Sequence, residues 1–441
     1  MKPTLLLYLL AALLLTGCLE ETCDEEVTFQ AFEPVIVSSE VWRTSDFTPR
    51  EAKSEVCDPS GFYVYQDLLF IVERGSGLHI LENAVPTNPL PLAFVPVPGG
   101  QGIAVRNGIL YMNQYTDLLA FDLSTPRKPA FLSRTENVIP LYSVFTHQLS
   151  ATEFVVDYVE TPRTVTVECG DSRLAQGGWW EEDIFFVRRG GCPNCAFAEF
   201  DGSLAGNTSA GDVVGQGGSL ARFTIANGTL YVVDESSLRT FNLSDPTTPE
   251  LIGTHQVGNG WGIETIFPYG NQLYIGSTTG MHIFDISNPN DPDFLSTFEH
   301  VLSCDPVVVA NDLAYVTLWG GSDCGTVQDQ LEVIDVSNPR RPVSLQIVAM
   351  ERSHGLGVAD GKLFLCAYDQ GVRVFDLTDT GLLGEQLYED NRLLAKDVIV
   401  LPENDQLIVF GEGEAGLEQY RYFEDGSLES LSHIDICRTG N

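Results

Sequence analysis

The sequence predicts an all-β protein, a β-propeller of four-stranded blades that follows a short N-terminal leader. Three observations predict this fold. A pattern of short apolar strands recurs roughly every 40 to 50 residues, its third strand ends in an Asp-hydrophobic-Ser turn, and Asn-Gly or Asp-Gly joins its first two strands. Four short strands in a unit of that length are typical of a propeller blade.

The first 17 residues are predicted to be a signal peptide. Met1 to Thr4 is short and positively charged, and Leu5 to Leu15 is an apolar run of eleven residues, shorter than the ~20 that a membrane helix needs. The run ends in Leu-Thr-Gly-Cys18, which is similar to the lipobox of bacterial lipoproteins. That resemblance implies cleavage before Cys18 and lipid attachment to it. The alternative is an ordinary signal peptide that contains a cysteine.

Residues 18–55 are expected to form a lipidated acidic tether. Residues 19–26 hold five acids in eight positions, which indicates a solvated spacer and also resembles the surface-export signals of Bacteroidetes lipoproteins. We therefore expect a lipid anchor in the outer membrane, with the protein at the cell surface. A periplasm-facing position is the alternative. Apolar side chains within residues 27–41 indicate a possible strand that closes the last blade.

The repeat organises residues 56–437 into the predicted propeller. Its three clearest copies begin at Leu118, Met281 and Leu331, and each runs through the Asp turn into two prolines. We count eight units, at about 56–97, 98–136, 137–217, 218–257, 258–300, 301–350, 351–390 and 391–437. The third unit carries an insertion at about 165–217. A seven-bladed ring is the alternative if the first or the insertion-bearing unit is incomplete.

The repeated polar residues are interpreted as turn formers. Asn-Gly and Asp-Gly suit tight hairpins because both positions need positive φ, and the paired prolines end strand pairing because proline donates no hydrogen bond to a neighbouring strand. Calcium binding is the alternative for the repeated aspartates, but each copy offers one acid where a calcium loop supplies several oxygens. No cofactor is expected, and a bound cation such as calcium stays open.

Charge excludes one class of partner. The chain has 61 acidic and 24 basic residues and a formal net charge of −37. Binding to phosphate backbones or to anionic membrane surfaces requires clustered Lys and Arg, and the sequence has no such run. Nucleic acid is therefore excluded, and contact with a membrane is expected through the N-terminal lipid only.

The strand and turn at residues 331–342, Leu-Glu-Val-Ile-Asp-Val-Ser-Asn-Pro-Arg-Arg-Pro, resemble the LVIVD repeat. The lipobox-like start, Cys23 and the segments at 77–81 and 117–122 also resemble LVIVD lipoproteins of Bacteroidetes-type bacteria. The resemblance implies a propeller fold and a family of largely unassigned role. The sequence departs from the repeat at Glu82-Asn83 in the first unit and at Tyr420-Arg421-Tyr422 in the last, where a ring must close.

The cysteines are expected to be mainly structural. Cys304 and Cys324 lie at the same end of one unit, so we predict a disulfide between them, and Cys366 lies inside an apolar strand as a buried free thiol. Three more cysteines belong to the insertion, and they favour a structural disulfide over a metal or redox site: Cys169, Cys192 and Cys195.

The same insertion carries Trp179 and Trp180 on a Gly-rich stretch. An aromatic pair in that setting is a candidate recognition loop for a protein or glycan. The alternative is that the two rings only pack the long loop against the body of the protein.

The first strands of propeller blades line the central channel, so the residues at their starts converge at one mouth. Alignment of the units puts six polar residues there, as a candidate ligand ring: Gln101, Arg222, Glu264, Asp305, His354 and Asp397. A polar ring could bind a cation or polar ligand, or could be polar only because channel mouths are wet. We found no nucleophile or phosphate motif.

Two functions follow as hypotheses. The first is a non-catalytic binding scaffold displayed on the bacterial cell envelope, with an unidentified protein or glycan partner. The alternative is a propeller hydrolase or lyase that uses a metal or acid–base site at the channel mouth.

Overall fold

The computed structural model describes residues 24–52, 56–141, 147–168, 178–181, 184–188, 213–259, 262–300, 306–319, 329–411, 416–435 and 437. The signal peptide and Cys18 lie outside these residues. Within the described part of the chain, no helix is long and apolar enough to span a membrane. Two compact units are present, one formed by 1–35 with 157–193 and the other by 36–156 with 194–441.

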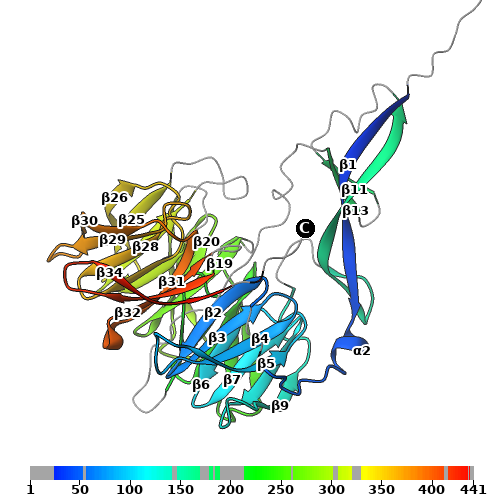
Figure 1. The fold of residues 1–441 in the computed structure, drawn as a ribbon, viewed down its shortest axis with the longest axis horizontal. Helices are drawn as coiled ribbons and strands as arrows, with labels where there is room; N and C mark the ends of the chain where they lie inside the picture. Colours follow the sequence, from blue (N-terminus) through cyan, green and yellow to red (C-terminus); the bar gives the residue numbers. More distant parts are fainter. Residues whose placement is uncertain are drawn as a thin grey trace, which may run out of the picture. The chain divides into compact units, whose positions relative to one another are not determined.

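The larger unit holds seven antiparallel sheets whose four strands follow one another in the chain (Figure 1). Blade 1 is β2 (Pro59–Tyr65), β3 (Leu68–Glu73), β4 (Gly77–Glu82) and β5 (Leu90–Pro96); blade 2 is β6 (Ile103–Arg106), β7 (Ile109–Gln114), β8 (Asp117–Asp122) and β9 (Ala130–Thr135). Blade 3 is β15 (Phe223–Ala226), β16 (Thr229–Val233), β17 (Ser237–Asn242) and β18 (Glu250–Gln256); blade 4 is β19 (Ile263–Tyr269), β20 (Gln272–Ser277), β21 (Gly280–Asp285) and β22 (Asp293–Glu299). Blade 5 is β23 (Val307–Ala310), β24 (Leu313–Leu318), β25 (Gln330–Asp335) and β26 (Val343–Ala349); blade 6 is β27 (Leu356–Ala359), β28 (Lys362–Cys366), β29 (Val372–Leu377) and β30 (Leu383–Asp390). Blade 7 is β31 (Ala395–Leu401), β32 (Gln406–Gly411), β33 (Leu417–Tyr422) and β34 (Leu428–Ile434), with a 3₁₀ turn at Pro402–Asn404 after its first strand.

Apolar clusters between neighbouring blades close these seven sheets into a ring. Each cluster joins one blade to the next, and the last joins blade 7 back to blade 1 through Phe62 and Phe410, whose rings stack at 5.6 Å. First strands lie innermost, and the fourth strands are largely exposed outside. The fold class is therefore confirmed, and the ring itself contains seven blades.

An eighth sheet accounts for the unit expected at 137–217. Its strands, in spatial order, are β10 (His147–Gln148), β11 (Glu153–Glu168), β1 (Asp24–Ser38), β13 (Ile184–Arg188) and β12 (Gly178–Glu181). Its apolar cluster is made of its own residues, Val27, Phe29 and Ala31 with Val165 and Ile184. The described residues therefore form eight sheets, as many as the units counted in the sequence. The eighth sheet does not have the strand order of a blade, because two distant segments of the chain supply its strands.

The predicted turn chemistry is confirmed at both kinds of turn. Asn107-Gly108 has φ values of 50° and 77°, and Asn227-Gly228 and Asp360-Gly361 repeat this pattern. At the other turn the repeated aspartate accepts a hydrogen bond from the serine two residues on, as Asp285 does from Ser287 N–H at 2.7 Å. Hydrogen bonds from the Ser287 side chain and from its N–H hold the pKa of Asp285 below its usual value. The repeated aspartates are used as turn caps.

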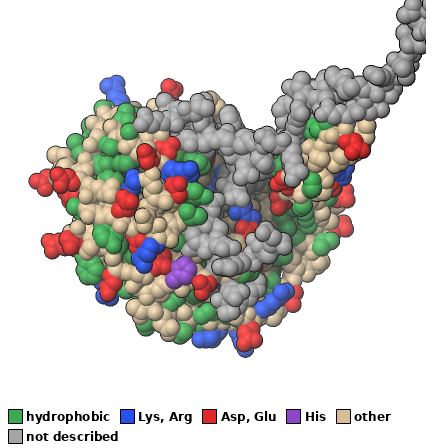
Figure 2. All heavy atoms as spheres, turned by 45° about the horizontal axis from the view of Figure 1, so that its top comes forward, with side chains coloured by type: hydrophobic (Ala, Val, Ile, Leu, Met, Phe, Trp, Pro, Cys, Tyr) green, Lys and Arg blue, Asp and Glu red, His purple; other side chains and the backbone are tan. Residues whose placement is uncertain are grey.

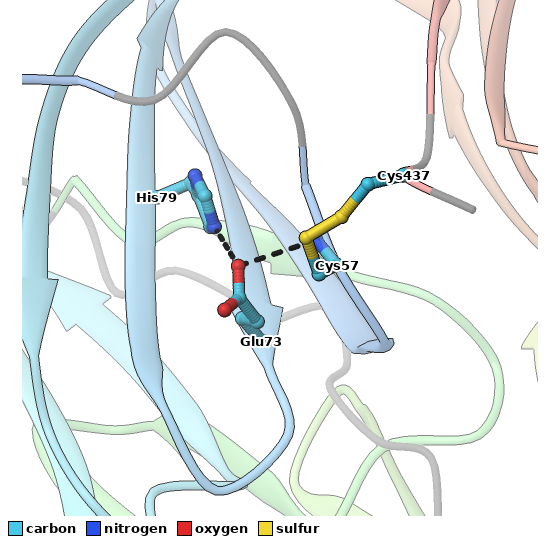
Figure 3. Close-up of a disulfide and its surroundings, with 4 residues drawn as sticks. All are labelled: Cys57, Glu73, His79 and Cys437. Atoms are coloured by element: carbon cyan, nitrogen blue, oxygen red, sulfur yellow. Dashed lines mark hydrogen bonds and ion pairs between the residues drawn. A yellow bond between two sulfur atoms is a disulfide. The ribbon is translucent and has the colours of Figure 1, made fainter. Parts of the chain in front are cut away.

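The ring closes by packing and by covalent linkage (Figure 3). Cys57, which precedes β2, forms a disulfide with Cys437, which follows β34, with their Cα atoms 5.0 Å apart. Beside it, the buried Glu73 and His79 side chains lie 2.6 Å apart, and Glu73 accepts a bond from Cys57 N–H at 3.2 Å. A strand from 27–41 does not close the last blade: Phe29 to Phe32 pair with β13 instead.

The chain that leads into the ring is held by one buried carboxylate. Asp117 accepts hydrogen bonds from the Arg43 and Arg134 guanidinium groups at 2.8–2.9 Å and from the Trp42 indole at 3.3 Å. Trp42 ends the short helix α2 (Ser39–Trp42). Burial alone would raise the pKa of Asp117, but the arginines and the Asn137 N–H outweigh it and hold the pKa below its usual value.

Candidate functional site in the central channel

The central channel contains a segment of the chain itself, residues 213–222, which we call the channel segment. It follows the insertion and leads into β15. Gly215 N–H donates to Val105 O of β6 at 3.0 Å, and the short strand β14 (Gln216–Gly217) pairs with β2. The Gln216 side chain donates to Val400 O of β31 at 3.0 Å. Inner strands of three consecutive blades, 7, 1 and 2, therefore hold this part of the segment.

Glycine is required because the strands approach so closely. A Cβ atom on Gly215 would lie 2.2 Å from the Tyr63 ring, and one on Gly218 would lie 1.8 Å from an Asp397 carboxylate oxygen. Contacts under 3 Å force a shift of the backbone or of a buried side chain. The Gly-rich sequence at 215–218 is thus a packing requirement.

Replacing Gly218 by Ala should therefore destabilise the protein by about 1–3 kcal/mol, the usual cost of overpacking a core. Urea unfolding would measure it. Gly384→Ala is the matched control, because Gly384 lies on the exposed strand β30 and its nearest neighbouring atom would be 3.1 Å away. Equal stability of the two variants would contradict the placement of the channel segment.

Asp397 is the predicted ring residue that the structure uses most directly. It lies on β31, is 3% exposed, and its Oδ1 accepts hydrogen bonds from Ser219 N–H, Ser219 Oγ–H and Val398 N–H at 2.8–2.9 Å. Ser219 Oγ in turn accepts from Leu356 N–H of β27 at 2.9 Å. Asp397 thus fixes the channel segment to blades 6 and 7.

Burial raises the pKa of Asp397 to about 7, although the hydrogen bonds from Ser219, Val398 and Leu220 act in the opposite direction. A carboxyl that titrates near neutral pH has the proton affinity of a general acid or base. Its oxygens, however, are occupied by donors of the protein's own backbone.

His354 precedes β27 and is 8% exposed. Its ring lies between Trp319, with ring centroids 4.4 Å apart, and Tyr368, at 5.3 Å, and both neighbours are nearly parallel to it. Its Nδ1 donates to Arg352 O at 2.9 Å. Tyr368 and Arg352 both adopt positive φ, of 42° and 53°. The imidazole is therefore a packed member of an aromatic stack at the mouth.

Three of the remaining ring residues, Gln101, Arg222 and Glu264, lie at or next to the starts of inner strands and act locally. Gln101 N–H donates to the Asn113 side chain at 2.9 Å. Arg222 is 3% exposed and donates to Ile263 O at 2.8 Å. Glu264 lies at an irregularity of β19, and Asp305 falls outside the described residues. Among the residues that the structure describes, no group of three or more His, Cys, Asp or Glu could hold a metal ion.

The cysteine predictions have different outcomes. Cys366 is confirmed as a buried free thiol. Five others fall outside the described residues, so the structure leaves their pairing open: Cys169, Cys192, Cys195, Cys304 and Cys324. Sequence reasoning missed the Cys57–Cys437 bridge, although the position of these residues just outside the first and last units was an available signal. The backbone of Trp179 and Trp180 lies in β12, opposite Phe186 and Phe185 of β13.

The channel segment was also missed. Its signal was the run Gly-Gln-Gly-Gly-Ser at 215–219 directly before the fourth predicted unit. From sequence, a Gly-rich stretch after a long insertion is interpreted as a linker. Its place inside the channel becomes evident only once the blades are assembled into a ring.

Comparisons with known proteins agree with the repeat and the fold. The family model described as the LVIVD repeat matches residues 265–299 and 304–349, which span blades 4 and 5. No curated protein matches the sequence.

Solved structures show the fold alone, because their sequence identities are low. A structure from Bacteroides fragilis, named as a candidate 6-phosphogluconolactonase, is 11% identical with a TM-score of 0.54, covering 86% of this chain and 96% of its own. The periplasmic gluconolactonase of Pseudomonas aeruginosa is 8% identical with a TM-score of 0.52, covering 93% and 96%. The computationally designed protein Ika8 is 8% identical with a TM-score of 0.50, covering 88% and 91%. With the repeat match, the ring of four-stranded blades makes this chain a β-propeller that carries LVIVD repeats.

Proposed function

We propose that the protein is a lipid-anchored, non-catalytic binding scaffold of the bacterial cell envelope, displayed at the cell surface. The observation that carries the proposal is the channel segment. Propellers gather ligand-binding groups where their inner strands converge, and here residues 213–222 occupy part of that place, with Asp397 and Ser219 committed to holding them. Partner binding is thereby assigned to the outer surfaces of the blades and to the insertion.

The surface agrees with a scaffold held away from a membrane. Figure 2 shows Asp and Glu side chains spread over the face in view, with fewer Lys and Arg among them. A net charge of −37 keeps a protein soluble and repels anionic surfaces, so the proposed anchor is the lipid on Cys18, reached through the acidic tether.

Localisation is tested on cells that produce the full chain. An alkyne-labelled fatty acid should be incorporated into the wild type and not into a Cys18→Ala variant, and externally added protease should degrade the wild type on intact cells. Labelling without protease sensitivity would place the protein on the periplasmic side. Absence of labelling would contradict the lipid anchor.

The alternative function, a hydrolase or lyase with an acid–base site at the mouth, is favoured by one feature: burial raises the pKa of Asp397 to about 7. Two of the structures with this fold are named as lactonases, so gluconolactone is a suitable first substrate. The scaffold proposal expects gluconolactone hydrolysis at the rate of buffer alone, with and without chelator. A protein-dependent rate that Asp397→Asn and His354→Ala both abolish would establish the enzyme instead.

A further inference from the structure

The channel segment occupies only part of the channel and leaves a cavity beside it. It lies between residues 216–219 of the channel segment and the inner strands of blades 4 to 7, and its volume is about 180 Å³. Its apolar wall is formed by Phe267, Val308, Val309, Leu356, Val358, Val398, Val400 and Pro402. All of these residues belong to the described part of the larger unit.

Two polar side chains along this cavity already form hydrogen bonds within the protein. Ser219 Oγ donates to Asp397 and accepts from Leu356 N–H, and the Gln216 amide donates to Val400 O. Most of the remaining wall is apolar, so the gain from binding comes mainly from burial of apolar surface. An enclosed apolar cavity of about 150 Å³ is large enough for benzene, so a cavity of about 180 Å³ has room for a single six-membered ring.

The cavity opens at the end of the channel where the inner strands finish. Leu356 and Val398, at the starts of β27 and β31, are buried, whereas Phe267 and Val358, near the ends of their strands, are partly exposed and Pro402 is exposed. The hairpin turns that follow these strands carry four exposed carboxylates: Asp312, Asp360, Glu403 and Asp405. Lys362, two residues after Asp360, is buried and donates a hydrogen bond to Asp360 O at 3.4 Å, so its ammonium group is not exposed beside these carboxylates.

We propose that this cavity is a binding site for a small apolar ligand of about the size of a monocyclic aromatic, neutral or cationic, and that the acidic turns select against anions. The electric field of the carboxylates weakens the binding of an anion at the opening and strengthens the binding of a cation. The inference is independent of the lipid anchor and of any protein partner, so its failure leaves the scaffold proposal unchanged.

Three probes of nearly one shape test it by calorimetry and ligand-observed NMR on the full chain: toluene, benzylamine and benzoate. We expect saturable 1:1 binding of toluene and benzylammonium, and at least fivefold weaker binding of benzoate than of benzylammonium at low salt. Added salt should narrow that difference, because it screens the acidic turns.

Val358→Phe fills the opening and should weaken toluene binding at least tenfold. Val343→Phe is the matched control, because Val343 is 55% exposed on the outer strand β26. This variant should bind toluene with the affinity of the wild type. If Val358→Phe fails to fold, Val308→Leu adds one methylene from blade 5 and should weaken toluene binding by a smaller factor. No saturable toluene binding, or binding unchanged in the filled variants, would overturn the proposal; benzoate bound as tightly as benzylammonium would overturn its charge selection.

Discussion

Loss of the Cys57–Cys437 disulfide should lower the free energy of unfolding by about 2–5 kcal/mol. The bridge joins residues 380 positions apart and fastens blade 7 to blade 1. Between these blades the described structure shows apolar packing and the Asn83–Gln419 side-chain pair, at 2.8–2.9 Å. Without the bridge, the unfolded chain gains the entropy of a large open loop, while the ring keeps only non-covalent contacts at its closure.

Urea unfolding of Cys57→Ser, Cys437→Ser and the double variant measures this effect. The two single losses should be nearly equal, and the double variant should lose no more than either, because both changes break the same bond. Reducing agent should destabilise the wild type more than the double variant, because the double variant has already lost this bridge. Additive single effects, or a wild type that reductant does not affect, would show that the ring closes without this bridge.

Asp397→Asn should become progressively more stable relative to the wild type as the pH rises from about 4 to about 7. Burial raises the pKa of Asp397 to about 7 in the folded protein, from the ordinary value of 3.8. Between these two values the folded state holds a proton that the unfolded state has lost, so wild-type stability falls as the pH rises and levels off above about 7. One pKa unit corresponds to about 1.4 kcal/mol, and the change is therefore of the order of 4 kcal/mol.

Asparagine is the suitable replacement, because its carbonyl oxygen keeps the three donors that meet Asp397 Oδ1 but carries no charge. Urea unfolding of both proteins at a series of pH values measures the difference, in which all other titrating groups cancel. A difference that stays constant with pH would mean that the hydrogen bonds from Ser219, Leu220 and Val398 fully offset the cost of burial.

Asp117→Asn provides a control of opposite sign. The arginines hold the pKa of Asp117 below its usual value, so the stability that its charge contributes is present at neutral pH and is lost as the pH falls through the folded-state pKa. The wild type should therefore exceed Asp117→Asn most at neutral pH and least in acid. The same trend for both variants would point to a general effect of pH on the fold.

Local chemistry explains what was predictable. Turn type is set by two or three neighbouring residues, so Asn107-Gly108 and the Asp285 cap could be recognised from sequence, and their spacing predicted both the strands and the propeller. Cys366 was predictable for the same reason, because an apolar strand with a cysteine in its middle buries that thiol. The candidate ring residues that the structure describes lie at or near the starts of inner strands, and these places followed directly from the repeat.

The sequence by itself thus determined the blade, its turns and the class of fold, since each depends on residues close together in the chain. Only the tertiary structure decided what meets across the ring. The pairing of β1 with β13, the bridge from Cys57 to Cys437 and the contact of Ser219 with Asp397 join segments more than 100 residues apart. Such contacts depend on ring closure and packing, which no local pattern encodes, and they give Asp397 of the predicted ligand ring the role of anchoring the channel segment.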